Sequence, residues 1–276
     1  MTTLALIGGD RRQHTLAKVL TEAGYHVTTR ALGNTADTET PLSAARAAIL
    51  PLPHMRGGLL YAPLCGAPTP LAPLLYALPA DALLFSGGAD STLRAVAGTR
   101  RIVSYADSEP LAVVGAVATA EGAIALAMEM LPCTLWRTPV AVLGYGRIGK
   151  LLAARLAALG ANVTVFARRP EARTWASAAG HTARPFDCPE FLQGARVIFN
   201  TAPAAVLSTD AIGYLARGTL YIELASTTGI DTTAAGRAGV RVELAPGLPG
   251  KCAPETAGKA LADVLLPLLY DADILP

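Results

Sequence analysis

The feature that most constrains this chain is a glycine-rich turn between a buried strand and a helix. Residues 140–143 form a short apolar run with the β-branched character of a buried parallel strand. A helix is expected at residues 150–159 and a second strand at residues 162–167. Between the first strand and the helix the sequence reads Gly144-Tyr145-Gly146-Arg147-Ile148-Gly149. This order predicts a βαβ unit that binds the diphosphate of a dinucleotide.

The three glycines of the turn have different physical tasks. Gly144 permits the tight turn, Gly146 lets the backbone approach a pyrophosphate, and Gly149 permits close packing of helix against strand. The start of the helix then offers unpaired N–H groups and partial positive charge to the diphosphate. A merely structural βαβ turn is the alternative interpretation.

The end of the second strand indicates which nicotinamide dinucleotide is bound. NAD sites usually place Asp or Glu there for the ribose 2′-hydroxyl, whereas arginine suits the 2′-phosphate of NADP. This chain has Arg168 and Arg169 at that point, with no carboxylate until Glu171. The sequence therefore favours NADP over NAD, the alternative being that the arginines form a solvated turn.

Length and composition favour a protein with large apolar cores. The chain has 276 residues, enough for two domains, and 52% of them are hydrophobic. A net charge of +2 without a long basic run argues against nucleic acid as a partner. We expect a cytoplasmic protein without a metal site, since residues 1–12 do not resemble a signal peptide and the four cysteines lack metal-type spacing: Cys65, Cys133, Cys188 and Cys252.

The alternation of strands and helices predicts an α/β fold with two doubly wound parallel-sheet domains. Residues 1–118 form the N-terminal domain, and residues 119–253 form a Rossmann NAD(P)-binding domain. Residues 254–276 are expected to pack back on the first domain. Residues 111–131 have the length of a membrane span, but a central charge at Glu121 would cost about 3 kcal/mol in lipid. We therefore expect a helix buried between the domains, and no membrane association.

Polar and glycine turns follow the predicted strands, where α/β folds bind ligands. In the first domain, the turns at residues 8–13 and 86–88 could hold an anion through backbone N–H groups, helped by Arg11 or Arg12. A glycine turn with solvated arginines is the alternative. In the second domain, the turns expected to border the dinucleotide contain Asn200, Thr201, Ala202, Pro203, Ala225 and Ser226.

Several short motifs occur in a fixed order along the chain. They are Ile7-Gly8-Gly9-Asp10-Arg11, Thr119-Ala120-Glu121-Gly122, Leu143-Gly144-Tyr145-Gly146-Arg147, Asn200-Thr201-Ala202-Pro203, Glu223-Leu224-Ala225-Ser226 and the segment 244–250. Together they resemble the A-subunit family of dipicolinate synthase across essentially the whole chain. The chain departs from that family at Ala118, where proline is usual, and at Thr227-Thr228-Gly229, where a Pro-Gly pair is usual.

The resemblance implies the architecture of D-2-hydroxyacid dehydrogenases and an NADP-dependent enzyme of sporulation. Such an enzyme, with a flavoprotein-like B subunit, oxidises dihydrodipicolinate to dipicolinate. The reaction removes a hydride and a proton from a ring that carries two carboxylates. We also expect a homo-oligomer.

The candidate substrate donors are Gly9, Arg11, Thr119 and Ser226, and we expect the ring to lie between the domains within their reach. Glu121 is the candidate catalytic proton acceptor, because burial in an apolar segment would raise its pKa. A helix carboxylate with a structural partner is the alternative interpretation of Glu121.

Two other functions stay open. A D-2-hydroxyacid dehydrogenase needs a histidine on the cofactor side, but none of the four histidines follows the turns at Asn200 or Ala225: His14, His26, His54 and His181. The chain could also be a noncatalytic NADP(H)-binding scaffold whose chemistry resides in its partner.

Overall fold

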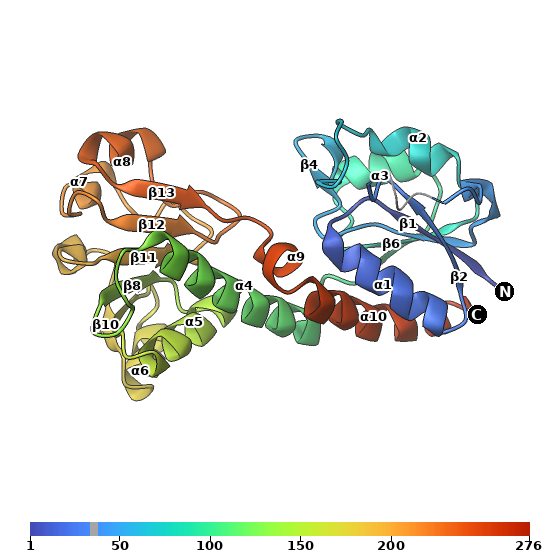
Figure 1. Cartoon of the computed structure of the whole chain (residues 1–276). Coiled ribbons are helices and arrows are strands. Elements are labelled where there is room, and N and C mark those ends of the chain that lie inside the picture. Colours follow the sequence, from blue (N-terminus) through green and yellow to red (C-terminus); the bar gives the residue numbers. More distant parts are fainter. Residues whose placement is uncertain (34–37) are drawn as a thin grey trace. The chain divides into compact units, whose positions relative to one another are not determined.

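The computed structural model describes residues 1–33 and 38–276, which form two compact units (Figure 1). Unit 1 contains Met1–Val114 and Ala253–Pro276, and unit 2 contains Gly115–Cys252. Each unit is built around a parallel sheet with helices on both faces. The predicted α/β fold class with two parallel-sheet domains is confirmed.

The sheet of unit 1 has the strand order β2-β1-β3-β6-β7. Its strands are β1 (Thr3–Ile7), β2 (His26–Arg30), β3 (Ala47–Ile49), β6 (Leu83–Ser86) and β7 (Ile102–Ser104). Alternate residues of β1 enter different cores, with Leu4 and Leu6 on one face and Ala5 and Ile7 on the other. The chain direction across the sheet reverses between β1 and β3, so this is the switch point where such sheets bind ligands.

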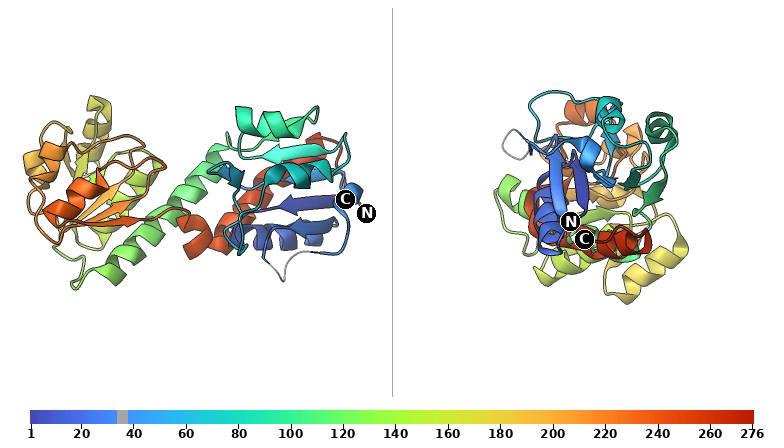
Figure 2. Two further views of the ribbon diagram at one scale, coloured as in Figure 1. Left: turned by 90° about the horizontal axis from the view of Figure 1, so that it is seen from above. Right: turned by 90° about the vertical axis from the view of Figure 1, so that its right-hand side faces the viewer.

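Both ends of the chain contribute to unit 1. Helix α10 (Pro254–Asp271) lies along α1 (Arg11–Glu22), and Gly258 permits the contact because a Cβ there would collide with the Arg12 carbonyl. Leu261 and Leu265 share one core with Leu16 and Leu20. The two termini lie side by side (Figure 2). The other face of the sheet is covered by α2 (Leu71–Tyr76) and α3 (Ser91–Ala97).

The sheet of unit 2 has the order β10-β9-β8-β11-β12-β13, which is the doubly wound order of dinucleotide-binding domains. The strands are β8 (Pro139–Leu143), β9 (Asn162–Phe166), β10 (Thr182–Arg184), β11 (Val197–Asn200), β12 (Leu220–Glu223) and β13 (Arg241–Leu244). The switch point lies between β8 and β11. Helix α5 (Arg147–Ala158) begins three residues before the predicted start, because Gly146 is its N-cap.

The remaining elements connect or cover these sheets. They are η1 (Leu42–Ala44), β4 (Met55–Arg56), β5 (Leu59–Leu60), α6 (Pro170–Ala178), η2 (Pro189–Leu192), α7 (Thr209–Ile212), α8 (Thr232–Ala238) and α9 (Leu248–Cys252). In unit 2, α5 and α6 contribute to one core, and α7 and α8 to the core on the opposite face of the sheet.

Helix α4 (Glu109–Met130) is continuous. Thr119 lies inside this helix, and its hydroxyl donates to the Gly115 carbonyl (2.8 Å) one turn back. By length and composition alone α4 could cross a membrane, and 44% of its most apolar window is buried inside the structure. Ala120, Ala123 and Ala127 pack in the core of unit 2, which accounts for the apolar character of that face.

Candidate functional site

A cavity of about 660 Å³ lies beside the glycine turn at the carboxyl ends of β8 and β9. It brings together most of the residues that the sequence indicates for the cofactor. Those that line it are Gly144, Tyr145, Gly146, Arg168, Arg169, Thr201, Ala202 and Pro203. Arg147 and Ile148 form the first turn of α5, Gly149 is buried behind them, and Ala225 follows β12.

The geometry of the turn suits a diphosphate. Gly144 has φ +98°, which favours glycine, and a Cβ on Gly149 would collide with the Gly144 carbonyl oxygen. A Cβ on Gly146 would meet no atom of the described chain within 4 Å. No side chain of the described residues caps α5 at Gly146. The open space therefore meets a helix start with N–H groups and partial positive charge, as dinucleotide binding requires.

Arg168 and Arg169 are exposed at the end of β9, where the ribose of a dinucleotide would lie. Arg173 donates from Nη1 to the carbonyls of Ala167 (2.9 Å) and Arg168 (2.7 Å), which fixes the backbone there. None of the described residues that line the cavity is a carboxylate. The site therefore presents two guanidinium groups without a competing negative charge.

Asn200 is buried and shapes the turn after β11. Its Nδ2 donates to Oε1 of Glu223 (2.8 Å) and to the Ala202 carbonyl (3.1 Å), and its Oδ1 accepts from the Ala202 N–H (3.0 Å). Its side chain is therefore occupied in holding the backbone at residues 200–203, which borders the cavity.

Glu223 is a buried carboxylate to which no sequence-based prediction assigns a function. Oε1 accepts from Asn200 Nδ2 and the Ala225 N–H (3.0 Å), and Oε2 accepts from the Gly229 N–H (2.7 Å) and the Tyr221 hydroxyl (3.3 Å). Burial, with Glu223 as the second cause, raises the pKa of Tyr221. Glu223 thus holds the loop that carries the exposed Ser226. The signal in the sequence was an acidic residue at the end of an otherwise apolar strand.

In unit 1, the turn after β1 does not offer its N–H groups to an anion. The Gly8 N–H donates to the Arg30 carbonyl (2.8 Å), and the Gly9 N–H donates to the Tyr61 carbonyl (2.6 Å). Asp10 caps α1 and pairs with Gln13 in a capping box. The predicted anion binding by Gly8 and Gly9 is wrong, because these donors are already used and a carboxylate occupies the helix start.

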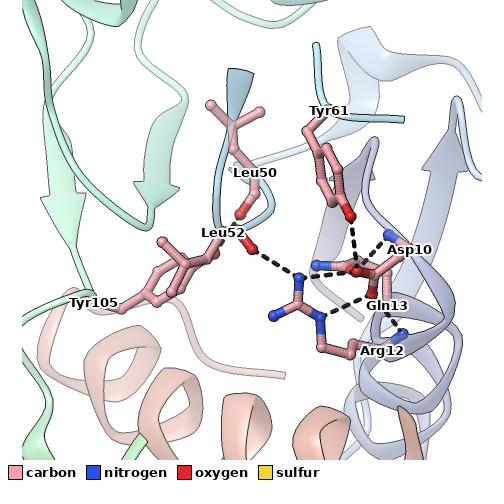
Figure 3. Close-up of polar contacts among 7 residues, drawn as sticks. All are labelled: Asp10, Arg12, Gln13, Leu50, Leu52, Tyr61 and Tyr105. Carbon is pink, nitrogen blue, oxygen red and sulfur yellow. Dashed lines mark hydrogen bonds and ion pairs between the residues drawn. The ribbon is translucent and has the colours of Figure 1, made fainter. Parts of the chain in front are cut away.

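Arg12 points toward the Leu52 carbonyl, which follows β3 (Figure 3). Arg12 Nε and Nη2 contact the Asp10 carboxylate at 2.8 and 3.0 Å, and Nη2 also donates to the Leu52 carbonyl (2.7 Å). The exposed Arg11 instead lines a groove with residues of α1 and α10. Neighbouring residues on a helix point about 100° apart, so only one of the two could face the site. Arg11 does not point toward the carboxyl ends of the strands, where the predicted substrate contact would have to lie.

Glu121 is exposed, so its predicted burial is wrong. Ala120 and Ala123 enter the core of unit 2, whereas Glu121 points outward and lies 3.4 Å from Nη2 of Arg155 on α5. This is the partnered helix carboxylate of the alternative interpretation. The burial on which its catalytic assignment depends is absent, and Glu121 is not proposed as the proton acceptor.

Replacing Glu121 by glutamine should change the free energy of unfolding by less than about 1 kcal/mol, because an exposed ion pair contributes little. Turnover should stay within about threefold, since the loss of a general base typically costs at least about 100-fold. Urea unfolding and steady-state rates test both, with Glu129→Gln as the exposed control on the same helix. A 100-fold loss of turnover in Glu121→Gln alone would restore its catalytic assignment.

A second ion pair lies at the carboxyl edge of unit 1. Nε2 of the buried His54 lies 3.1 Å from Oδ2 of Asp90. Asp90 caps α3 by accepting from the Leu93 N–H (2.8 Å), and this bond, followed by smaller contributions that include His54, lowers the pKa of Asp90. The sequence places His54 and Asp90 after different strands, so their meeting could not be seen from spacing.

Comparison with known proteins gives a consistent result along the chain. Residues 3–106 match the family model for the N-terminal domain of the A subunit of dipicolinate synthase. Residues 118–234 match the model for the NAD binding domain of D-isomer specific 2-hydroxyacid dehydrogenase. The chain is 33% identical to the A subunit of dipicolinate synthase from Bacillus subtilis (strain 168), over 97% of this chain and 96% of that protein.

Solved structures agree with this similarity. The A subunit of dipicolinate synthase from Bacillus halodurans superposes with a TM-score of 0.85 at 28% identity, covering 97% of each chain. The apo form of D-lactate dehydrogenase from Escherichia coli superposes with a TM-score of 0.63 at 14% identity, over 100% of this chain and 98% of that one. The second likeness concerns the fold alone.

Proposed function

Because this chain belongs to the A-subunit family of dipicolinate synthase and carries a nicotinamide dinucleotide-binding domain, we propose that it oxidises dihydrodipicolinate to dipicolinate. We further propose NADP as the oxidant, a B subunit for its partner, and a role in sporulation inside the cytoplasm. The observation that carries the oxidoreductase assignment is the open space in front of Gly146 at the uncapped start of α5.

The residues of unit 2 would hold the cofactor. The turn Gly144–Gly149 and the first turn of α5 would bind the diphosphate, Arg168 and Arg169 the 2′-phosphate, and the Thr201–Pro203 segment would border the dinucleotide. When bound, the oxidised nicotinamide accepts a hydride. The chain's own residues then have to orient a dicarboxylate ring and accept one proton.

The proposed substrate donors are Ser226 and Arg12, each described within its own unit. Ser226 is exposed on the loop held by Glu223. Thr119 is buried and its hydroxyl already donates to the Gly115 carbonyl (2.8 Å), so it is not kept as a proposed donor. In unit 1, Arg12 replaces Arg11 as the proposed cation, because its guanidinium reaches the Leu52 carbonyl after β3. Carboxylates are bound well by guanidinium and hydroxyl donors.

Incubating the purified chain with dihydrodipicolinate and NADP⁺ tests the proposed function. We expect dipicolinate and NADPH to appear in equal amounts, either with the chain alone or when a B subunit is added. A chain that binds NADP⁺ but makes no dipicolinate under either condition would contradict the enzymatic role and favour a scaffold.

Replacing both Arg168 and Arg169 by serine should raise the Kd of NADP⁺ by about 10- to 100-fold, because charged hydrogen bonds to the 2′-phosphate are lost. The Kd of NAD⁺ should change by less than about threefold, since NAD⁺ lacks that phosphate. Fluorescence titration measures both constants, with Arg237→Ser on α8 as the control for removing one exposed arginine elsewhere in the same unit. An equal loss of both affinities would contradict the assignment to NADP.

A further inference from the structure

The described residues of unit 2 include a single histidine, His181. It is buried, and burial lowers the pKa of its imidazole ring. Unit 1, in contrast, pairs His54 with Asp90. His54 follows β3 and Asp90 follows β6, and these two strands are adjacent and parallel. Both residues therefore lie at the carboxyl edge of the sheet, where α/β folds bind ligands.

Backbone hydrogen bonds connect His54 to the switch point between β1 and β3. The His54 carbonyl accepts from the Tyr61 N–H (3.0 Å), and the Tyr61 carbonyl accepts from the Gly9 N–H (2.6 Å) in the turn after β1. Arg12 fixes the Leu52 carbonyl two residues before His54 (Figure 3). The histidine backbone is thus held from the same elements that form the ligand-binding edge.

The contact with Asp90 gives the two ring nitrogens of His54 different roles. Nε2 is buried beside the Asp90 carboxylate, and no well-directed hydrogen bond reaches it within the described residues, so the contact is mainly electrostatic. A carboxylate at that distance favours the tautomer that carries its N–H on Nε2. Nδ1 has no hydrogen-bond partner in the described chain and keeps its lone pair. Nδ1 of His54 can therefore accept a proton from a bound substrate.

We propose that His54 is the catalytic proton acceptor of the oxidation, and that Asp90 is its positioning residue. This inference rests on the proposed function. One ring C–H bond of dihydrodipicolinate breaks with its electron pair, which leaves as a hydride and reduces NADP⁺. A neighbouring bond to hydrogen breaks, its electrons enter the aromatic ring, and the proton moves to Nδ1 of His54. The products are dipicolinate, NADPH and a protonated His54, which then releases its proton to water.

The surroundings of His54 contain several charged or titratable groups. Asp90 faces the ring from the start of α3, and Tyr61 contacts the backbone of His54 from the segment after β5. Tyr61 in turn meets Asp10 (3.4 Å) and the Arg56 guanidinium (5.4 Å from its ring centre), and Arg12 pairs with Asp10. Burial, and next the Asp10 carboxylate, raise the pKa of the Tyr61 hydroxyl.

The test compares His54→Gln, Asp90→Asn and the control His26→Gln, which alters an exposed histidine bonded to Thr40. We expect His54→Gln to lower kcat by about 100- to 1,000-fold, the range for loss of a general base. Its Kd for NADP⁺ should equal that of the wild type. The decline of kcat at acid pH should disappear in His54→Gln and persist in His26→Gln.

Asp90→Asn removes the charge of the carboxylate but should leave the protein folded, because asparagine can also cap α3. We expect it to lower kcat by about tenfold at an unchanged Kd for NADP⁺, and the acid decline of kcat should persist because His54 is still present. An Asp90→Asn variant or a His54→Gln variant with kcat within about threefold of wild type overturns the inference. A wild-type chain without turnover would instead overturn the proposed function, and this inference with it.

Discussion

Gly146→Val is expected to raise the Kd of both nicotinamide dinucleotides by about 100-fold or more, equivalent to about 2.7 kcal/mol, while the protein stays folded. A Cβ at this position meets no atom of the described chain within 4 Å, so we expect the fold to accommodate the substitution. The same side chain fills the space through which the diphosphate must approach the start of α5. Isothermal titration with NADP⁺ and thermal melting measure the two effects separately.

Gly149→Val is the matched control, because the same change three residues on should act through the fold. Its Cβ would collide with the backbone oxygen of Gly144, which cannot rotate away as a side chain could. We expect the free energy of unfolding to fall by about 3 kcal/mol. Equal loss of stability in both variants, or normal nucleotide binding by Gly146→Val, would contradict the role given to the turn.

Glu223→Ala is expected to lower the free energy of unfolding by about 3 to 5 kcal/mol, because it removes the carboxylate that accepts four buried or partly buried hydrogen bonds. The donors left without a partner are Asn200 Nδ2, the N–H groups of Ala225 and Gly229, and the Tyr221 hydroxyl. Urea unfolding measures the loss. Glu171→Ala, at an exposed glutamate in the first turn of α6, should cost less than about 1 kcal/mol.

The loop beyond Glu223 makes this variant informative about function as well. Glu223 fixes both ends of the segment from Ala225 to Gly229, and Ser226 lies within it. We therefore expect the KM for the dicarboxylate to rise in any Glu223→Ala protein that stays folded at low temperature. A loss of stability below about 1 kcal/mol would show that the loop is held by other contacts.

The fold and the glycine turn could be predicted because each depends on local chain properties. An apolar run followed by G-x-G-x-x-G requires backbone freedom at Gly144 and space at Gly146, and the structure has both. Parallel strands follow from the alternation with helices, which the sequence repeats in both units. The helix at α5 nevertheless starts earlier than predicted, since the sequence pattern does not show where a cap begins.

The side-chain assignments failed where direction depends on the packing of distant elements. Arg11 and Arg12 are equivalent in the sequence, and only the position of β3 and its Leu52 carbonyl selects Arg12. Glu121 lies in an apolar run, but the core of unit 2 takes only one face of α4. His54 and Asp90 are far apart along the chain and meet because β3 and β6 are neighbours.

The two-part composition of unit 1 has a consequence for how the protein is made. Gly115–Cys252 is one uninterrupted stretch, so unit 2 can acquire its core as soon as that stretch has left the ribosome. Unit 1 needs α10, which follows unit 2 in the sequence, to cover Leu16 and Leu20. During translation, the first strands of unit 1 and α1 therefore keep an apolar face exposed until α10 has been made. Unit 2, which we propose binds the cofactor, can be complete before unit 1, to which we assign proton transfer.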